Sequence, residues 1–251
     1  MAAARADDTD HHAARALATA AGELLVELRA GGLEGRELKE AGDRASHDFL
    51  MAELGARCPT DAVLSEEGAD DEARLARRRV WIVDPLDGTR EFAEPPRDDW
   101  AVHVALALDG VATVGAVALP ALGVTLATDH PPPPPAPPAR APRILVSRTR
   151  PTEHARFLAD QLGGELVPMG SAGAKAMAVV RGEADIYAHS GGQYEWDSAA
   201  PVAVAAAAGL HVSRLDGAPL RYNRPDPYLP DLLVCRPELA SPVIDLCRRV
   251  A

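Results

Sequence analysis

Residues 81–90 read WIVDPLDGTR, a short apolar run that ends in two acids and a glycine turn. The apolar residues predict a buried strand that stops at Asp84-Pro85, because a proline keeps the residue before it out of helical geometry. Asp87 follows on the turn, with the carbonyl of Leu86 between the two acids. Hard oxygen ligands of this kind suit Mg²⁺, so the stretch predicts a metal-binding loop at a strand end.

The residues after the second acid are suited to binding phosphate. Gly88 lets the backbone approach a ligand closely, and its amide and that of Thr89 can face a phosphate oxygen. Thr89 also carries a hydroxyl that can orient a water molecule. Taken alone, the stretch leaves a simpler alternative open, namely two ordinary turns without any ligand.

Further acids follow other predicted elements. Glu66 and Glu67 end a short predicted strand at 62–65, where the alternative is a solvated loop. Asp197 stands just ahead of an Ala-rich helix predicted over 198–208, where an acid is also a good N-cap. The two roles of Asp197 are compatible, because a capping carboxylate has a fixed direction.

The composition excludes some classes of protein. The chain has 251 residues, 47% of them apolar, and a formal net charge of −11, which argues against binding to nucleic acid. A protein this acidic can hold an anionic substrate only where cations or backbone amides reverse the local field. Three widely spaced cysteines predict free thiols.

The first ten residues carry three Asp and no apolar segment, so no signal peptide is expected. Residues 101–128 are apolar, but Asp109-Gly110 and Pro120 interrupt them, and paired strands are expected there in place of a membrane span. These features predict a cytoplasmic protein with no membrane partner.

Periodicity predicts two halves, residues 1–139 and 140–251. Helices over an antiparallel sheet are expected in the first half, and alternating strands and helices in the second. The run at 131–138 holds seven prolines and is expected to be a solvated loop or the joint between the halves, with a recognition motif for a proline-binding partner as the alternative. The predicted elements are helices at 11–29 (ending near Gly31-Gly32), from near Asp43 through Leu54, 152–162, 172–181 and 198–208, and strands at 62–65, 80–83, two or three within 100–128, 143–147 and 184–188.

The order Asp43, Glu66-Glu67, DPLDGT at 84–89 and Trp196-Asp197 resembles the inositol monophosphatase superfamily of Mg²⁺-dependent, lithium-sensitive phosphatases. The resemblance covers nearly the whole chain and is specific as a joint pattern, although no single piece is. It implies a layered αβαβα sandwich.

Three local features resemble the 3′(2′),5′-bisphosphate nucleotidase (CysQ-like) branch of that superfamily, which serves sulfate assimilation. Arg90-Glu91-Phe92 follows the metal loop, GSAGAK at 170–175 precedes GEADIY at 182–187, and EWDSAA occupies 195–200. An acid that inositol phosphatases commonly carry seven residues before the Trp-Asp aspartate is Ser190 here, which makes inositol a less expected substrate.

The resemblance implies a role for each matching position. Two or three Mg²⁺ ions would bind, one at Glu66, Asp84 and the Leu86 carbonyl, and a second at Asp84, Asp87 and Asp197. Catalysis would use Asp43, Glu66 and Thr89 to orient and deprotonate the attacking water. The implied substrate contacts are Asp87, Gly88, Thr89, Arg90, Ser171, Lys175 and Asp197. Lys175 is also one of only two lysines beside 24 arginines, although a surface lysine with no role is an equal alternative on that ground alone.

The expected reaction is hydrolysis of the 3′-phosphate of adenosine 3′,5′-bisphosphate to AMP and phosphate by two-metal activation of water, with 3′-phosphoadenosine 5′-phosphosulfate as a further candidate substrate. The alternatives are a broad inositol-phosphate or fructose 1,6-bisphosphate phosphatase and a catalytically silent nucleotide-binding protein. A homodimer is left open. His103 and His189 are interpreted as packed or hydrogen-bonded residues without a catalytic role.

Overall fold

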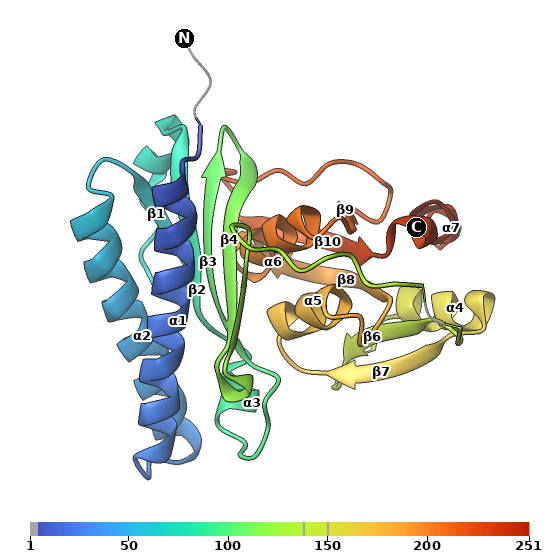
Figure 1. The fold of residues 1–251 in the computed structure, drawn as a ribbon, viewed down its shortest axis with the longest axis horizontal. Coiled ribbons are helices and arrows are strands. Elements are labelled where there is room, and N and C mark those ends of the chain that lie inside the picture. The colour runs from blue at the N-terminus through green and yellow to red at the C-terminus, as the bar shows by residue number, and fades with distance from the viewer. Residues whose placement is uncertain (1–4, 138, 150, 251) are drawn as a thin grey trace.

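A computed structural model describes residues 5–137, 139–149 and 151–250, and these form five stacked layers (Figure 1). Helices α1 and α2 cover one face of the first sheet, α5 and α6 lie between the two sheets, and α4 and α7 cover the outer face of the second sheet. The predicted αβαβα sandwich is thereby confirmed. The helices are α1 (Asp8–Ala30), α2 (Gly35–Arg57), α3 (Thr89–Phe92), α4 (Glu153–Leu162), α5 (Ala172–Val180), α6 (Glu195–Ala207) and α7 (Ala240–Cys247), with 3-10 turns at η1 (Glu72–Ala76), η2 (Pro120–Leu122) and η3 (Pro237–Leu239).

The first sheet has the strand order β1-β2-β3-β4-β5, and the second has the order β7-β6-β8-β10-β9. In the first sheet β1 runs parallel to β2 and the other neighbours are antiparallel, so the predicted antiparallel sheet has one parallel pair. In the second sheet β6 is parallel to both β7 and β8. The strands are β1 (Ala62–Ser65), β2 (Arg79–Asp87), β3 (Ala101–Leu108), β4 (Val111–Leu119), β5 (Val124–Ala127), β6 (Arg143–Ser147), β7 (Glu165–Met169), β8 (Ile186–Tyr194), β9 (His211–Ser213) and β10 (Tyr228–Cys235).

The first helix begins at Asp8, three residues before the predicted start. The Asp7 side chain accepts hydrogen bonds from the amides of Thr9 and Asp10, which fixes the N-terminus of the helix. The helix ends at Gly31 as predicted, where the Gly31 amide donates to the carbonyl of Leu28.

The second helix begins at Gly35, and the prediction of a start near Asp43 is wrong. No side-chain cap marks its N-terminus, so the usual sequence signal is absent. As a result Asp43 lies in the middle of a helix. Its neighbour Gly42 packs closely, because a Cβ there would lie 2.7 Å from Phe92 Cε1, and this contact brings α2 against α3.

Strand β2 continues to Asp87, past the predicted stop at Asp84-Pro85. Asp84 still pairs with His103 on β3, and Asp87 pairs with Ala101 after an irregularity in the register. Pro85 lacks an amide, but its carbonyl accepts a hydrogen bond from Ser46 Oγ at 2.7 Å. The strand therefore carries both aspartates of the loop to one end of the sheet.

Strand β8 also runs further than predicted, to Tyr194 and not only to Ala188. Gly191 and Gly192 adopt φ of 108° and 90°, and the pairing with β10 shifts register nearby, so the glycines bend the strand without ending it. Helix α6 then starts at Glu195, three residues before the predicted position. The remaining predicted elements agree with the structure to within two residues, including the Asp109-Gly110 hairpin.

The middle layer forms a core that both halves of the chain share. One cluster of buried apolar residues combines Ile82 and Val117 of the first sheet with Met177 of α5 and Leu232 of the second sheet. The two sheets use chain segments on either side of residues 128–142, but the continuous core joins them. A domain boundary at residue 139 stays a prediction.

The described part of the chain contains no helix with the length and apolarity that a bilayer crossing requires. The apolar residues 101–128 form β3, β4 and β5 as expected. Cys58, Cys235 and Cys247 are free, which confirms the prediction of thiols without disulfides.

The described prolines, 131–135 and 137, lie in an extended connection between β5 and β6, and Pro138 is outside the described residues. The guanidinium group of Arg236 donates hydrogen bonds to the carbonyls of Pro135 and Ala136 at 3.0 and 2.9 Å. Arg236 is buried and also faces Asp185. The connection is therefore fastened to the second sheet.

Candidate metal centre

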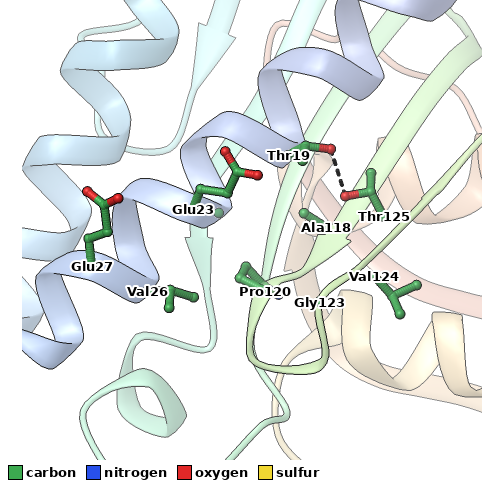
Figure 2. Close-up of a pocket in the computed structure, with 10 residues that line it drawn as sticks. Thr19, Glu23, Val26, Glu27, Ala118, Pro120, Gly123, Val124 and Thr125 are labelled. Carbon is green, nitrogen blue, oxygen red and sulfur yellow. Dashed lines mark hydrogen bonds between the residues drawn. The ribbon is translucent and has the colours of Figure 1, made fainter.

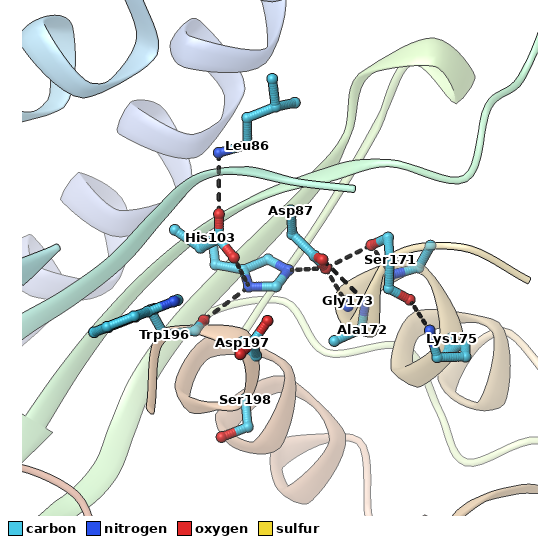
Figure 3. A network of polar contacts seen from close by, with 12 residues as sticks. Leu86, Asp87, His103, Ser171, Ala172, Gly173, Lys175, Trp196, Asp197 and Ser198 are labelled. Atoms are coloured by element: carbon cyan, nitrogen blue, oxygen red, sulfur yellow. Dashed lines mark hydrogen bonds and ion pairs between the residues drawn. The ribbon is translucent and has the colours of Figure 1, made fainter. Parts of the chain in front are cut away.

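Three carboxylates from distant parts of the chain meet between the two sheets. Asp84 and Asp87 come from the end of β2, and Asp197 comes from the first turn of α6. One oxygen of each lies within 4.8 Å of the others, and Figure 3 shows Asp87 and Asp197 of this group. The sequence predicted all three as metal ligands, and the structure brings their carboxylates together.

Asp84 is fully buried. Its Oδ1 accepts a hydrogen bond from the Leu86 amide at 3.0 Å, which fixes the carboxylate at the bend after the proline. Burial, and then the negative charges of Glu66 and Asp87, raise the pKa of Asp84 well above its usual range. A carboxylate in this position is stable only when a proton or a cation compensates its charge.

Asp87 has the opposite electrostatic environment, although it is equally buried. Ser171 Oγ and the amides of Ala172 and Gly173, at the start of α5, donate to it at 2.5, 3.1 and 2.6 Å. Burial alone would raise the pKa of Asp87, but the contact with His103 and these hydrogen bonds outweigh it and lower the pKa to about 2. Asp87 therefore stays ionised without a cation.

His103 is packed and hydrogen-bonded as predicted, but its contact with Asp87 was not anticipated. The side chain is fully buried, with Nε2 3.2 Å from Asp87 and Nδ1 3.0 Å from the Trp196 carbonyl (Figure 3). Burial would lower the pKa of His103, but the hydrogen bond to Asp87 raises it overall. The contact of His103 with the acids could have been predicted only from the register of β2 and β3, in which Asp84 pairs with His103, and the sequence does not give that register.

Asp197 is the third residue of α6 and not its N-cap. Its Oδ2 accepts a hydrogen bond from the Tyr194 amide at 2.6 Å, so it caps the helix from within the first turn. Burial, and then the charge of Asp87, raise the pKa of Asp197 to about 6. The fixed direction expected of a capping acid is present, although the position in the helix differs.

Glu66 lies at the edge of this group, on the turn after β1. Burial of its carboxyl group raises its pKa to about 7, with further effects from Asp197 and Asp87, while a hydrogen bond with Asp84 acts in the other direction. The residue as a whole is exposed, so solvent screens part of this shift. Glu66 therefore borders the three-aspartate group from the solvent side.

Thr89 and Asp43 form a hydrogen-bonded pair beside the metal loop. Thr89 Oγ1 lies 3.3 Å from Asp43 Oδ1 and 3.1 Å from the Leu86 carbonyl, and it can donate to either. Burial, and then the negative charge of Glu67, raise the pKa of Asp43 to about 6. A carboxylate with a pKa near neutrality can accept a proton from a group that Thr89 holds.

The predicted phosphate-binding turn is present. Gly88 has a φ of 87°, which favours glycine, and a Cβ there would lie 3.1 Å from Ser171. Helix α3 begins directly after Gly88, and Arg90 on this helix is exposed. These residues border the acids, but their contact with a substrate stays a prediction.

Ser171 and Lys175, predicted as nucleotide contacts, already have partners within the protein. Ser171 Oγ binds Asp87 and also accepts from the Ala174 amide at 2.9 Å. Lys175 is buried, and its ammonium group donates to the carbonyls of Gly170 and Ser171 at 2.9 and 2.6 Å. Lys175 is thus not an exposed surface lysine, and its charge lies near Asp87 and Asp197.

The donor set fits divalent cations. Three aspartates and Glu66 lie close together, and the charges of His103 and Lys175 act on Asp197. Asp84 and Asp197 both have raised pKa values because each is buried close to other acids. Carboxylate oxygens in such a group are the ligands that Mg²⁺ prefers, and a bound cation would remove the repulsion.

A separate groove of about 310 Å³ lies between α1 and the edge strand β5 (Figure 2). Thr19 and Thr125 hydrogen bond across it at 2.8 Å, and Glu23 and Glu27 give it a negative rim. It lies on the side of the first sheet that α1 covers, away from α5 and α6. A phosphate has no cationic partner among these lining residues.

Comparisons with known proteins agree with this geometry. The sequence profile of the inositol monophosphatase family matches residues 7–131 and 136–243. The 3′-phosphoadenosine 5′-phosphate phosphatase of Mycobacterium leprae (strain TN) is 51% identical, over 98% of this chain and 96% of that protein. The 3′(2′),5′-bisphosphate nucleotidase CysQ of Escherichia coli (strain K12) is 32% identical over 75% of this chain and 81% of its own length.

Among solved structures, CysQ from Bacteroides thetaiotaomicron matches with a TM-score of 0.76 at 28% identity, over 91% of this chain and 97% of that chain. Inositol monophosphatase-II from Staphylococcus aureus MSSA476 matches with a TM-score of 0.80 at 22% identity, over 95% and 96% of the two chains, which indicates a shared fold. The likeness therefore includes both sheets.

Proposed function

Because this chain belongs to the inositol monophosphatase family, we propose that it hydrolyses the 3′-phosphate of adenosine 3′,5′-bisphosphate, giving AMP and inorganic phosphate. The observation that carries the proposal is the convergence of the Asp84, Asp87 and Asp197 carboxylates beside the Gly88 turn. The names of the relatives at 51% and 54% identity support this substrate. By the same relationship, 3′-phosphoadenosine 5′-phosphosulfate is a second nucleotide to test.

Members of the family depend on metal ions, and we propose Mg²⁺, in two or three sites, for this chain. Asp84, Asp87 and Asp197 would hold the cations, with Glu66 and the Leu86 carbonyl as further ligands. When bound, such cations neutralise charge on the phosphate and lower the pKa of water. The raised pKa values of Asp84 and Asp197 support cation binding here, because each of these acids lies close to other acids.

The protein's own groups that orient and deprotonate the attacking water are Thr89, Asp43 and Glu66. Thr89 takes a proton from the attacking water as it passes its own hydroxyl proton to Asp43, whose raised pKa suits this acceptance near neutrality. The water oxygen forms the new bond to phosphorus, and the bond from phosphorus to the ribose 3′-oxygen breaks. Solvent protonates the departing 3′-oxygen, and the Gly88 and Thr89 amides hold the phosphate.

Hydrolysis of inositol phosphates or fructose 1,6-bisphosphate is the second candidate, since the fold is shared with inositol monophosphatases. The chain carries Ser190 where an acid for sugar hydroxyls would stand in the inositol enzymes. This difference favours the nucleotide. The homodimer also remains a proposal, which sedimentation can measure.

The test is a comparison of kcat/KM for adenosine 3′,5′-bisphosphate, inositol 1-phosphate and fructose 1,6-bisphosphate at one Mg²⁺ concentration. The nucleotide is expected to be the best substrate, and a better sugar or inositol phosphate would refute the assignment. Asp84→Asn should abolish turnover of every substrate, because it removes a ligand shared by the cations. Asp48→Asn, at an exposed acid on α2, is the matched control and should retain wild-type turnover.

A further inference from the structure

The exposed aromatic side chains of this protein gather beside the metal centre. The chain has only three Phe, four Tyr and three Trp. Among the described residues, the large aromatic side chains that are exposed to solvent are those of Tyr194 and Tyr228, with exposed fractions of 46% and 47%. Both lie at the ends of neighbouring strands, where they pair directly across β8 and β10. Two exposed rings side by side in an aromatic-poor protein indicate a binding surface.

Together with Trp196, these rings form what we call the aromatic corner (Tyr194, Trp196 and Tyr228). The Tyr194 ring is stacked on the Trp196 ring, with centroids 4.9 Å apart and planes 9° from parallel. The Tyr228 ring meets Tyr194 nearly at a right angle, 82°, with centroids 6.0 Å apart. Trp196 therefore supports one face of Tyr194, while almost half of the Tyr194 side chain stays open to solvent.

The backbone near the corner is shaped to hold these rings. A Cβ at Gly192 would lie 2.4 Å from the Tyr228 hydroxyl, so the Tyr228 ring lies directly against a residue without a side chain. Gly192 also has a φ of 90°, which places it in the bent part of β8. The bend and the ring contact occur together, two residues before Tyr194.

The aromatic corner is continuous with the metal centre. The Tyr194 amide donates to Asp197 Oδ2 at 2.6 Å, and the Trp196 carbonyl faces His103 Nδ1 at 3.0 Å. One segment of four residues therefore carries both a proposed metal ligand and the stacked rings. A phosphate ester held beside Asp197 would extend the rest of its molecule past this segment, and an uncharged ring would meet aromatic faces there.

We propose that the aromatic corner binds the purine base of the nucleotide substrate, which stacks on the part of Tyr194 that is open to solvent. This inference rests on the proposed function, since it gives the nucleotide a binding group that inositol phosphates cannot use. Stacking on an aromatic side chain is largely independent of base identity, so the corner selects nucleotides over sugar phosphates and selects weakly among bases.

The experiment uses Tyr194→Ala, Tyr228→Ala and Tyr194→Phe in the full-length protein. For Tyr194→Ala, kcat/KM for adenosine 3′,5′-bisphosphate should fall about 10- to 100-fold, mainly through KM, because one stacking contact is lost. Tyr228→Ala should show a smaller loss in the same direction, and Tyr194→Phe should retain wild-type values because it keeps the ring. Hydrolysis of inositol 1-phosphate should change less than about twofold in each variant. Val111→Ala is the control, because Val111 is an exposed apolar residue at the start of β4, directly after the Asp109-Gly110 turn.

A binding measurement separates this inference from the proposed function. Calorimetry with AMP and with ribose 5-phosphate compares two ligands that differ only by the base, and Tyr194→Ala should weaken AMP alone. If the nucleotide is a poor substrate but AMP binding depends on Tyr194, the proposed function fails and the corner stands. If Tyr194→Ala binds AMP as wild type does, or loses both ligands equally, the corner is refuted even when the nucleotide is the preferred substrate. A change in sedimentation without a change in AMP affinity would instead assign these rings to contact with a second copy, which also refutes the inference.

Discussion

Gly173→Ala tests whether the buried contacts around Asp87 set the catalytic geometry. Gly173 is buried at the start of α5, and its amide donates to Asp87 at 2.6 Å. An added Cβ would lie 2.0 Å from His103 Nε2. His103 is fully buried and is held on its other side by the Trp196 carbonyl, so the ring has no open space to enter.

The size of the effect follows from this distance. An ordinary contact requires a separation of roughly 3.5 Å, so the ring or the helix end must move by roughly 1.5 Å. Overpacking of this kind costs about 1–3 kcal/mol of stability. A displacement of about 1 Å at a reacting centre lowers the rate about 100-fold, so we expect kcat to fall by about that factor and Mg²⁺ to bind more weakly.

The assay compares kcat, Mg²⁺ affinity by calorimetry and urea unfolding with those of Gly55→Ala. Gly55 is also helical, in α2, but nothing lies within 4 Å of its added Cβ. Alanine there should stabilise the protein by about 0.5–1 kcal/mol and leave kcat unchanged. A Gly173→Ala protein with wild-type kcat and Mg²⁺ affinity would refute the view that the contacts between His103, Asp87 and α5 fix the metal ligands.

Three further predictions concern the hydroxyl of Thr89, the pH dependence of stability and the ion pairs of Arg79. Thr89→Val should lower kcat about 100- to 1,000-fold with little change in KM, while Thr89→Ser keeps most of it; wild-type turnover in the valine variant would exclude the hydroxyl from the reaction. The pKa of Asp197 is raised to about 6 and that of Glu66 to about 7 in the native protein. In the unfolded chain both carboxyl groups have their lower, ordinary pKa values, so at a pH between the two the native protein binds protons that the unfolded chain has released. The melting temperature of the metal-free protein should therefore fall as the pH rises from about 5 to about 8, and the gain from Mg²⁺ should be larger at the higher pH; a gain equal at both would contradict these shifts. Arg79→Met should destabilise the protein by about 2 kcal/mol in urea unfolding, because Arg79 pairs with Asp10 and Asp61 at 2.6 and 2.9 Å and their charges would stay partly buried; a loss below about 0.5 kcal/mol would show that solvent already screens these pairs.

The proposed metal ligands on β2 could be predicted because they lie in a recognisable local pattern. Asp84 and Asp87 follow an apolar run and stand before and after Pro85-Leu86, and this pattern predicts both carboxylates at a strand end. The fold class followed from the order of elements and from the family resemblance. Element ends were predicted less well where no side chain marks them, as at Gly35, where α2 begins without a cap.

The roles of His103 and Lys175 could not be predicted, because they depend on contacts between elements. His103 meets Asp87 through the register of β2 and β3 and through the packing of α6. Lys175 was interpreted either as a ligand contact or as a surface residue, but its ammonium group lies buried on the carbonyls of Gly170 and Ser171. Periodicity identifies a buried face, but it does not show which polar groups meet there.

The fastening of the proline-rich connection has a consequence for how this protein could be redesigned. Proline nitrogens cannot donate hydrogen bonds, so the prolines of this connection offer only acceptors, and Arg236 donates to the carbonyls of Pro135 and Ala136. Pro135 also lies where a Cβ at Gly182 would meet it at 2.8 Å. The connection therefore acts as a spacer of fixed length and not as a flexible linker. Cutting the chain within it to make new termini should leave both sheets intact only if Arg236 keeps its partners.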